Sequence, residues 1–223
     1  MITKTQGIVL NHIPYGESSI IARIYTQQFG YQGFLVNNVR SSKTKHSIAY
    51  FQPFTILDLV IYWKNSREIQ RISEYKSVVN WHADDIRKQT VLLFLGEVVD
   101  KLLRNEHTEN PALFSYLNNS LNFFKTTSSI ENFHLTFLLQ LTPYLGFGIS
   151  TGEELFENMN QVMQHDEIEH LINELLSSNF SANVPSSGEL RYQSLTCLMD
   201  YFGHHVPGFG EVRSLKVLKQ IFR

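Results

Sequence analysis

The spacing of the apolar residues changes near residue 80, and this change divides the chain into two parts with different expected folds. Between residues 3 and 79, apolar residues occur in short runs or alternate with polar ones, with Pro, Gly and Asn between the runs. This pattern predicts four or five short strands, enough for a small barrel. From residue 83 onward, apolar residues recur at spacings of three and four, which is typical of helices. We therefore expect an α+β chain with a β module over residues 1–80 and an all-helical domain over residues 81–223.

Two of the expected strands have distinct patterns. In Ser19–Thr26 successive residues point to opposite faces, which separates Arg23 from the face formed by Ile20, Ala22 and Ile24. The stretch Phe54–Trp63 is apolar almost throughout, which predicts a strand covered on both sides. Asp58 is the exception.

The second part predicts a series of helices. A long one follows Ala83, and its apolar stripe extends to Leu103. Asn110 and Pro111 form a helix start, with Asn as the cap and Pro where its missing N–H costs nothing. The further helices are expected over 130–146, 166–178 and 188–203, and a last one is expected to be capped by Ser214 and to end at Phe222.

Charge is unevenly divided between the two parts. Residues 1–80 contain nine Lys and Arg against four Asp and Glu, a net charge of +5, whereas residues 81–223 contain ten against seventeen, a net charge of −7. A basic module joined to an acidic one indicates a polyanionic partner for the basic module. Its helical neighbour is not expected to bind phosphate by itself.

Composition indicates an ordinary globular protein, with 43% hydrophobic and 18% charged residues. No uncharged apolar run reaches the roughly 18 residues of a membrane span, and the N-terminus does not have the pattern of a signal peptide. The single Cys197 excludes an internal disulfide and fits a reducing compartment. We expect a cytoplasmic protein that does not bind membranes.

No motif in the chain predicts catalysis. There is no GxxxxGK[ST], GxGxxG or GxSxG sequence. His165 and His170 are five residues apart, and the rotation of about 140° between such positions on a helix prevents them from converging on a metal. Cys197 lies among Leu and Met residues and is expected to be a buried, inert thiol. We therefore predict no enzyme, no catalytic residue, no metal and no cofactor.

Basic and aromatic residues of the β module favour nucleic-acid binding. The loop Arg40–Lys45 has three positive charges and no carboxylate, so it can follow a phosphate backbone. Arg67 and Arg71 are four residues apart and are expected to share a strand face, with Lys64 in the preceding turn. The candidate DNA-binding residues are Arg23, Arg40, Lys43, Lys45, Lys64, Arg67 and Arg71. The candidate rings for stacking on unpaired bases are Tyr15, Tyr25, Tyr31, Tyr62 and Tyr75. The alternative for each ring is a place in the core.

Several short motifs, in order along the whole chain, resemble the bacterial RecO family. They are Pro14–Ser18, Thr26–Gly30, the strand and basic segment Gly33–Lys45, Gln52–Phe54, His205–Phe209 and Ser214–Leu218. The resemblance implies an OB-fold followed by a helical domain. It also implies a protein of the bacterial nucleoid that binds single- and double-stranded DNA, anneals complementary strands and, with RecR and single-strand-binding protein, helps to load the RecA recombinase.

The chain departs from the family pattern in two places. Many members carry a four-cysteine zinc site in the helical domain, and with only Cys197 this chain does not have it. The family commonly has a second positive residue shortly before the position of Arg40, where this chain has Asn37 and Asn38. We therefore expect no zinc and a DNA-binding surface that differs in detail.

The C-terminal helix is the candidate surface for a protein partner. Arg213, Lys216 and Lys219 lie beside an apolar face formed by Leu215, Leu218 and Phe222. Cations next to an apolar slot would suit the acidic, hydrophobic tail of a single-strand-binding protein. In the alternative interpretation the apolar residues pack into the core. A non-DNA scaffold, in which the barrel and the acidic helices bind proteins, is the alternative function.

Overall fold

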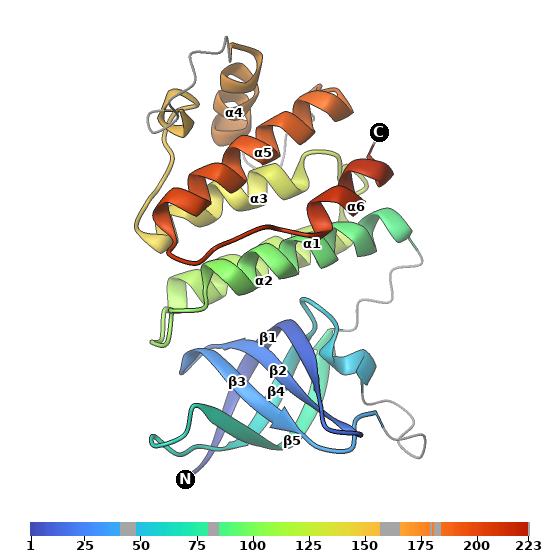
Figure 1. Ribbon diagram of the computed structural model, residues 1–223, viewed down its shortest axis with the longest axis vertical. Coiled ribbons are helices and arrows are strands. Elements are labelled where there is room, and N and C mark those ends of the chain that lie inside the picture. Colours follow the sequence, from blue (N-terminus) through green and yellow to red (C-terminus); the bar gives the residue numbers. More distant parts are fainter. Residues whose placement is uncertain (41–47, 80–84, 157–165, 179, 181–183, 223) are drawn as a thin grey trace. The chain divides into compact units, whose positions relative to one another are not determined.

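A computed structural model describes residues 1–40, 48–79, 85–156, 166–178, 180 and 184–222 (Figure 1). Five strands form a closed barrel in the order β1-β2-β3-β5-β4. They are β1 (Ile2–Tyr15), β2 (Ser19–Thr26), β3 (Gly30–Val36), β4 (Ile56–Tyr62) and β5 (Ile69–Val79). All neighbouring strands are antiparallel except β3 and β5, which are parallel. This order and these directions are those of an OB-like barrel, and the predicted fold class is confirmed.

The long first strand closes the barrel. Figure 1 shows β1 curving along two neighbours, and its residues pair with β2 on one side and β4 on the other. The pairing with β2 shifts by one residue between Val9 and Asn11, as in a β-bulge. The enclosed core contains Ile24, Phe34 and Leu59, with Phe51 from the short 3-10 helix η1 (Ile48–Phe51).

The expectation that the Phe54–Trp63 strand is covered on both sides is wrong for the face that carries Asp58 and Tyr62. In β4, Leu57, Leu59 and Ile61 face the core, whereas Asp58 and Tyr62 are exposed. The strand is antiparallel to both neighbours, and such a strand can leave one face to solvent. The exposure of Asp58 agrees with the sequence pattern.

The rest of the described chain is helical. The α-helices are α1 (Ile86–Leu102), α2 (Pro111–Thr126), α3 (Phe133–Leu141), α4 (Asp166–Ser178), α5 (Gly188–His205) and α6 (Ser214–Ile221). Two further 3-10 helices are η2 (Thr142–Leu145) and η3 (Glu153–Leu155). The predicted cap of α2 is confirmed, because the backbone N–H of Leu113 donates to the Asn110 side chain over 3.0 Å. Among the described residues, no helix combines the length and apolar character needed to cross a membrane.

The predicted bounds of three helices are wrong. The helix expected over 130–146 is α3, which begins at Phe133 and ends before Pro143, because proline cannot continue α-helical bonding. The helix expected to end at Gly203 continues to His205. Ser214 is the first residue of α6 and not its cap; Arg213 occupies the cap position and makes no capping side-chain bond.

The chain forms two compact units. The first comprises residues 1–84 and 96–121, and the second comprises residues 85–95 and 122–223. Helices α1 and α2 each contribute to both units. The barrel therefore shares its unit with the end of α1, the start of α2 and the connection between these helices.

Candidate nucleic-acid interface

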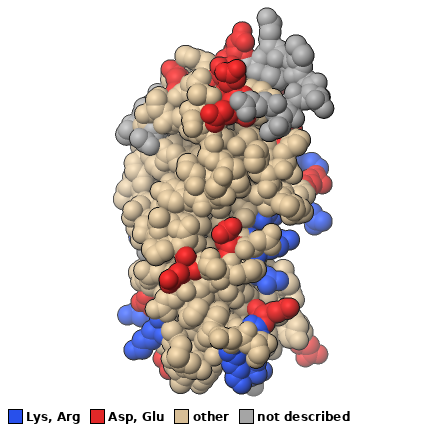
Figure 2. Space-filling model, turned by 90° about the vertical axis from the view of Figure 1, so that its left-hand side faces the viewer, with Lys and Arg blue, Asp and Glu red and all other residues tan. Residues whose placement is uncertain are grey.

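A groove of about 730 Å³ lies on the first unit. Its lining includes Asn11 of β1, Arg23 of β2, Tyr31 of β3, Arg67 of the β4–β5 turn, and Arg104, which follows α1. The β2–β3 face and the β4–β5 turn are where OB-folds bind oligonucleotides and oligosaccharides. Figure 2 shows cations and carboxylates interspersed over one side of the molecule, with several cations on the barrel.

Three neighbouring strands position Arg23 in this groove. Arg23 pairs with Asn11 on one side and with Gly33 on the other. A Cβ at Gly33 would stand only 2.7 Å from the Nη1 atom of Arg23, so the guanidinium extends across the glycine. The bulge next to Asn11 sets the register of this row.

A buried glutamine shapes the β4–β5 turn. The Gln70 side-chain amide donates to the backbone carbonyls of Lys64, over 2.9 Å, and Arg67, over 2.7 Å, and it accepts from the Lys64 N–H over 3.0 Å. The turn therefore has a fixed backbone that presents two exposed cations.

Trp63 supplies an aromatic wall at the start of the same turn. Its ring stacks on Phe29 with centroids 3.9 Å apart and 16° between the planes. Its indole N–H donates to the Asn65 side chain over 2.6 Å, and both Trp63 and Asn65 line the groove. An indole ring fixed in this way is a suitable platform for an unpaired base.

The connection between α1 and α2 forms another wall. The Tyr31 N–H donates to the Glu106 carbonyl over 2.7 Å, and the His107 Nδ1 lies 3.0 Å from the Tyr31 carbonyl. Gly30, at φ +60°, lies so close to this connection that a Cβ would overlap the carbonyl oxygens of Glu106 and Thr108. These contacts fix the connection against the barrel.

A buried carboxylate lies at the groove. Asp100 is 5% exposed and accepts a hydrogen bond from the Tyr31 hydroxyl over 2.7 Å. Its second oxygen is 3.4 Å from Nη2 of Arg104. Burial and then the Asp100 charge raise the pKa of Tyr31, while the charges of Arg23 and Arg104 oppose this rise. Both arginines therefore lie close enough to act on the same hydroxyl.

The predicted DNA-binding residues do not all meet. Arg23 and Arg67 line the groove. Arg40 is exposed and donates to the Gly16 carbonyl over 3.3 Å, whereas Lys64 lies in the groove's turn without lining it. Arg71 of β5 is exposed and does not line the groove either. Lys43 and Lys45 lie outside the described residues.

One sequence-based expectation about this surface is wrong, and for two of the candidate rings the core alternative holds. Arg67 and Arg71 do not share a strand face, because β5 begins at Ile69 and Arg67 belongs to the turn. Tyr25 and Tyr31 are buried and not available for stacking; Tyr25 packs against Phe114 with centroids 6.5 Å apart. The alternative of core rings applies to both.

Of the other candidate tyrosines, two face solvent. Tyr15 is 54% exposed and Tyr62 is 46% exposed. Tyr75 is half-buried and packs against Phe51 with centroids 5.1 Å apart.

Sequence reasoning missed Trp63 and Arg104 as groove residues. Arg104 belongs to the part of the chain that carries net negative charge, so its contribution to the barrel surface depends on a tertiary contact. The one feature of the sequence that could have indicated Arg104 is its position directly after the apolar stripe of a long helix, at the start of a polar connection.

Comparisons of this chain with family models and with curated proteins agree on one family. The family model described as "Recombination protein O N terminal" matches residues 1–81, and "Recombination protein O C terminal" matches residues 83–160. The DNA repair protein RecO of Flavobacterium psychrophilum is 33% identical over 241 residues, covering 100% of both chains. The same holds, at 31% identity over 244 residues, for the DNA repair protein RecO of Phocaeicola vulgatus. The chain belongs to the RecO family of DNA repair proteins.

The C-terminal helix of this RecO-family chain is anchored in the second unit. Leu218 and Phe222 are buried. For these two residues the alternative interpretation, packing into the core, is therefore correct. Lys216 pairs with Glu211 over 2.8 Å, and Lys219 lies 3.7 Å above the Tyr192 ring. Arg213 is exposed. A pocket of about 520 Å³ beside α6 is lined by Tyr192, Met199, Val212, Leu215 and Lys216.

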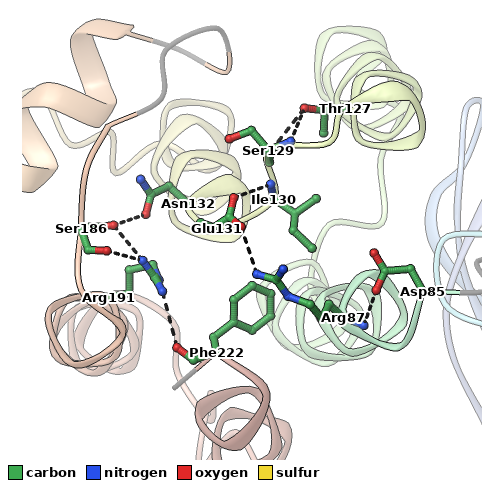
Figure 3. A network of polar contacts seen from close by, with 10 residues as sticks. All are labelled: Asp85, Arg87, Thr127, Ser129, Ile130, Glu131, Asn132, Ser186, Arg191 and Phe222. Carbon is green, nitrogen blue, oxygen red and sulfur yellow. Dashed lines mark hydrogen bonds and ion pairs between the residues drawn. The ribbon is translucent and has the colours of Figure 1, made fainter.

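A polar network fixes the end of α6 (Figure 3). Arg87 pairs with Glu131 over 3.0 Å and lies 5.0 Å from the centre of the Phe222 ring. Arg191 donates to the Ser186 carbonyl over 2.6 Å and reaches the Phe222 carbonyl over 3.5 Å. Figure 3 shows the two arginines approaching Phe222 from different helices. These contacts account for the burial of Phe222.

The described part of the RecO-family helical domain contains no cluster of three or more His, Cys, Asp or Glu that could hold a metal. Cys197 is half-buried and not fully buried as expected. Burial, followed by the Asp200 charge, raises the pKa of this thiol. The shift is opposite to the one that activates a cysteine nucleophile. His165 lies outside the described residues.

Proposed function

We propose that this chain is a recombination mediator that binds single- and double-stranded DNA, anneals complementary strands and helps to load the RecA recombinase together with RecR. The observation that carries the proposal is the meeting of Arg23, Arg67 and Arg104, from three separate segments, at one groove on the ligand face of an OB-like barrel. Membership of a DNA repair family supports the same function.

The groove suits a nucleic-acid strand for physical reasons. Arginines neutralise phosphates and release counterions, which makes the affinity depend on salt. Trp63 offers a stacking surface, and the side-chain amides of Asn11 and Asn65 line the same groove. Annealing needs two strands brought together with their charges neutralised, so this function requires neither a catalytic residue nor a cofactor.

The DNA path is proposed to extend beyond the groove. It continues over Arg40, Lys64 and Arg71 and includes Lys43 and Lys45, with residues 1–80 as the DNA-binding domain. Residues 81–223 form the proposed helical domain for protein contacts. A protein of this function works in the bacterial cytoplasm, at the nucleoid.

For the protein partners we propose RecR and single-strand-binding protein. Arg213, Lys216 and Lys219 are the candidate contacts for an acidic tail. The pocket beside α6 supports this placement, because the apolar side chains of Met199, Val212 and Leu215 line it together with the Lys216 cation. A tail peptide titrated onto the full chain and onto its Lys216→Glu variant tests the contact; equal affinities would contradict it.

The DNA-binding proposal is tested by a double variant, Arg23→Gln with Arg67→Gln. Each lost phosphate contact lowers the slope of log affinity against log salt by about 0.7, so the two changes together lower it by about 1.4. Anisotropy of a labelled single strand measures the slope. The matched control is Lys4→Gln with Lys76→Gln, which removes two exposed barrel cations that do not line the groove.

The control variant should keep the wild-type slope. Equal slopes in all three proteins would contradict DNA binding in the groove. A wild-type protein without steep salt dependence would favour the alternative function, a scaffold whose barrel binds proteins.

A further inference from the structure

The three arginines of the groove differ in their surroundings. Among the described residues, the guanidinium groups of Arg23 and Arg67 form no ion pair, whereas Arg104 pairs with Asp100. The distance between Arg104 Nη2 and Asp100 Oδ2 is 3.4 Å. One of the three cations that would meet a phosphate therefore already has an internal anion.

Asp100 is fixed in place, whereas Arg104 is not. The Asp100 side chain is 7% exposed, and its other oxygen accepts the Tyr31 hydroxyl hydrogen bond at 2.7 Å. The Arg104 side chain is 58% exposed. The arginine can therefore turn toward a ligand in the groove, whereas the carboxylate is held by the Tyr31 hydroxyl and has little access to water. Loss of the arginine leaves a buried carboxylate whose side-chain partner among the described residues is the Tyr31 hydroxyl alone, and this has an energetic cost.

We propose that Asp100 competes with DNA phosphate for Arg104 and so restrains the affinity of the groove. This proposal rests on the proposed DNA-binding function. A strand that enters the groove gains Arg104 only by weakening an internal ion pair, and it also approaches the negative charge of Asp100. In contrast, Arg23 and Arg67 bind phosphate without such a loss. The expected result is weaker binding, and faster release of a strand, than three arginines alone would give.

A double-mutant cycle of Asp100→Asn and Arg104→Gln tests the competition. Asparagine keeps an oxygen that can accept the Tyr31 hydroxyl hydrogen bond, but it removes the charge. Asp100→Asn should tighten single-strand binding about three- to tenfold, the size of one moderate charge interaction. It should also steepen the salt slope by about 0.7, because Arg104 then becomes a full phosphate contact.

The arginine variant shows whether this gain comes through Arg104. In the wild-type background, Arg104→Gln should weaken binding by a smaller factor than Arg23→Gln does, because Asp100 already neutralises part of the Arg104 charge. In the Asp100→Asn background, it should remove most of the gain. Glu68→Gln is the matched control, since Glu68 is the other carboxylate of the groove and forms no ion pair with a described residue. Its effect should be the same with and without Arg104.

Additive effects of Asp100→Asn and Arg104→Gln would overturn the proposal, because they would mean that Asp100 acts only by repulsion at a distance. If circular dichroism shows that Asp100→Asn does not fold, the salt slopes of Arg104→Gln and Arg23→Gln test the proposal instead. Arg104→Gln should then lower the salt slope by less than half of the decrease caused by Arg23→Gln. Equal decreases would overturn the proposal but leave DNA binding intact. A wild-type chain that binds no DNA would contradict both this proposal and the proposed function.

Discussion

At the scale of single residues, Gly30 has a structural role that the sequence around it does not reveal. Gly30 has φ +60°, and the connection after α1 passes directly over it. The sequence could predict a turn at this position, since it lies between two strand-like runs. The contact with a segment more than seventy residues away could not be predicted, because it depends on how the connection between α1 and α2 packs on the barrel.

Gly30→Ala should destabilise the protein more than Gly16→Ala. Both glycines have positive φ, at 60° and 59°, so alanine costs about 1 kcal/mol of backbone strain at either position. Only at Gly30 does the new Cβ also overlap carbonyl oxygens, which should bring the loss of unfolding free energy to about 2–4 kcal/mol. Urea unfolding of both variants measures the difference. Equal losses would contradict the close packing at Gly30.

His134 makes the stability of the second unit depend on pH. Its side chain is buried, and its Nδ1 has no hydrogen-bond partner among the residues that the structure describes. Burial, followed by the Arg191 charge, lowers its pKa to about 3. The folded state therefore favours the neutral ring. The neutral His134 ring therefore contributes to the free energy of unfolding in full above the unfolded-state pKa of about 6.5. This contribution is lost as the pH falls toward the folded-state pKa, by about 1.4 kcal/mol per pH unit.

The His134→Leu variant tests this dependence. Between pH 7.5 and pH 5, the wild-type free energy of unfolding should fall by about 2 kcal/mol more than that of the variant, because leucine does not bind a proton. Denaturant unfolding at both pH values provides the comparison. Parallel pH profiles would show that His134 is accessible to protons in the folded state.

At the scale of elements, the sequence predicted helix starts correctly where neighbouring residues determine them. Asn110 predicted the start of α2 because its side chain caps the helix it precedes. The range expected for the helix 166–178 agrees with α4, whose first turn is acidic, as favoured at that end of a helix. The start of α3 and the β4–β5 turn were mispredicted, since their bounds depend on tertiary contacts. In the turn, Gln70 binds three backbone groups from inside the barrel.

Asn110→Ala should lower the free energy of unfolding by about 1 kcal/mol, because the Leu113 N–H loses its cap. Asn119→Ala is the control on the same helix. Asn119 is exposed within α2, where alanine has the higher helix propensity, so this change should leave stability equal or raise it by about 0.5 kcal/mol. A thermal unfolding curve for each variant checks the two signs. Destabilisation by both changes would contradict the assignment of the cap.

At the scale of the whole molecule, the charge division along the chain gave an incomplete description of the binding surface. The basic part, with net charge +5, does contain Arg23 and Arg67. The groove also takes Arg104 and Asp100 from the acidic part of the sequence, because the barrel forms one unit with the end of α1 and the start of α2. The sequence could predict the barrel, the helices and the family, but not a groove assembled across that division.

The central claim, that DNA lies in this groove, is tested most directly by the fluorescence of Trp63. The chain has two tryptophans, so Trp81→Phe leaves Trp63 as the single emitter. Titration with an unlabelled single strand should quench this emission in a saturable manner, because Trp63 lines the groove and bases stack on it. The quenching midpoint should match the affinity from anisotropy and move with salt in the same way. Salt-dependent binding by anisotropy without any change in Trp63 emission would contradict the account.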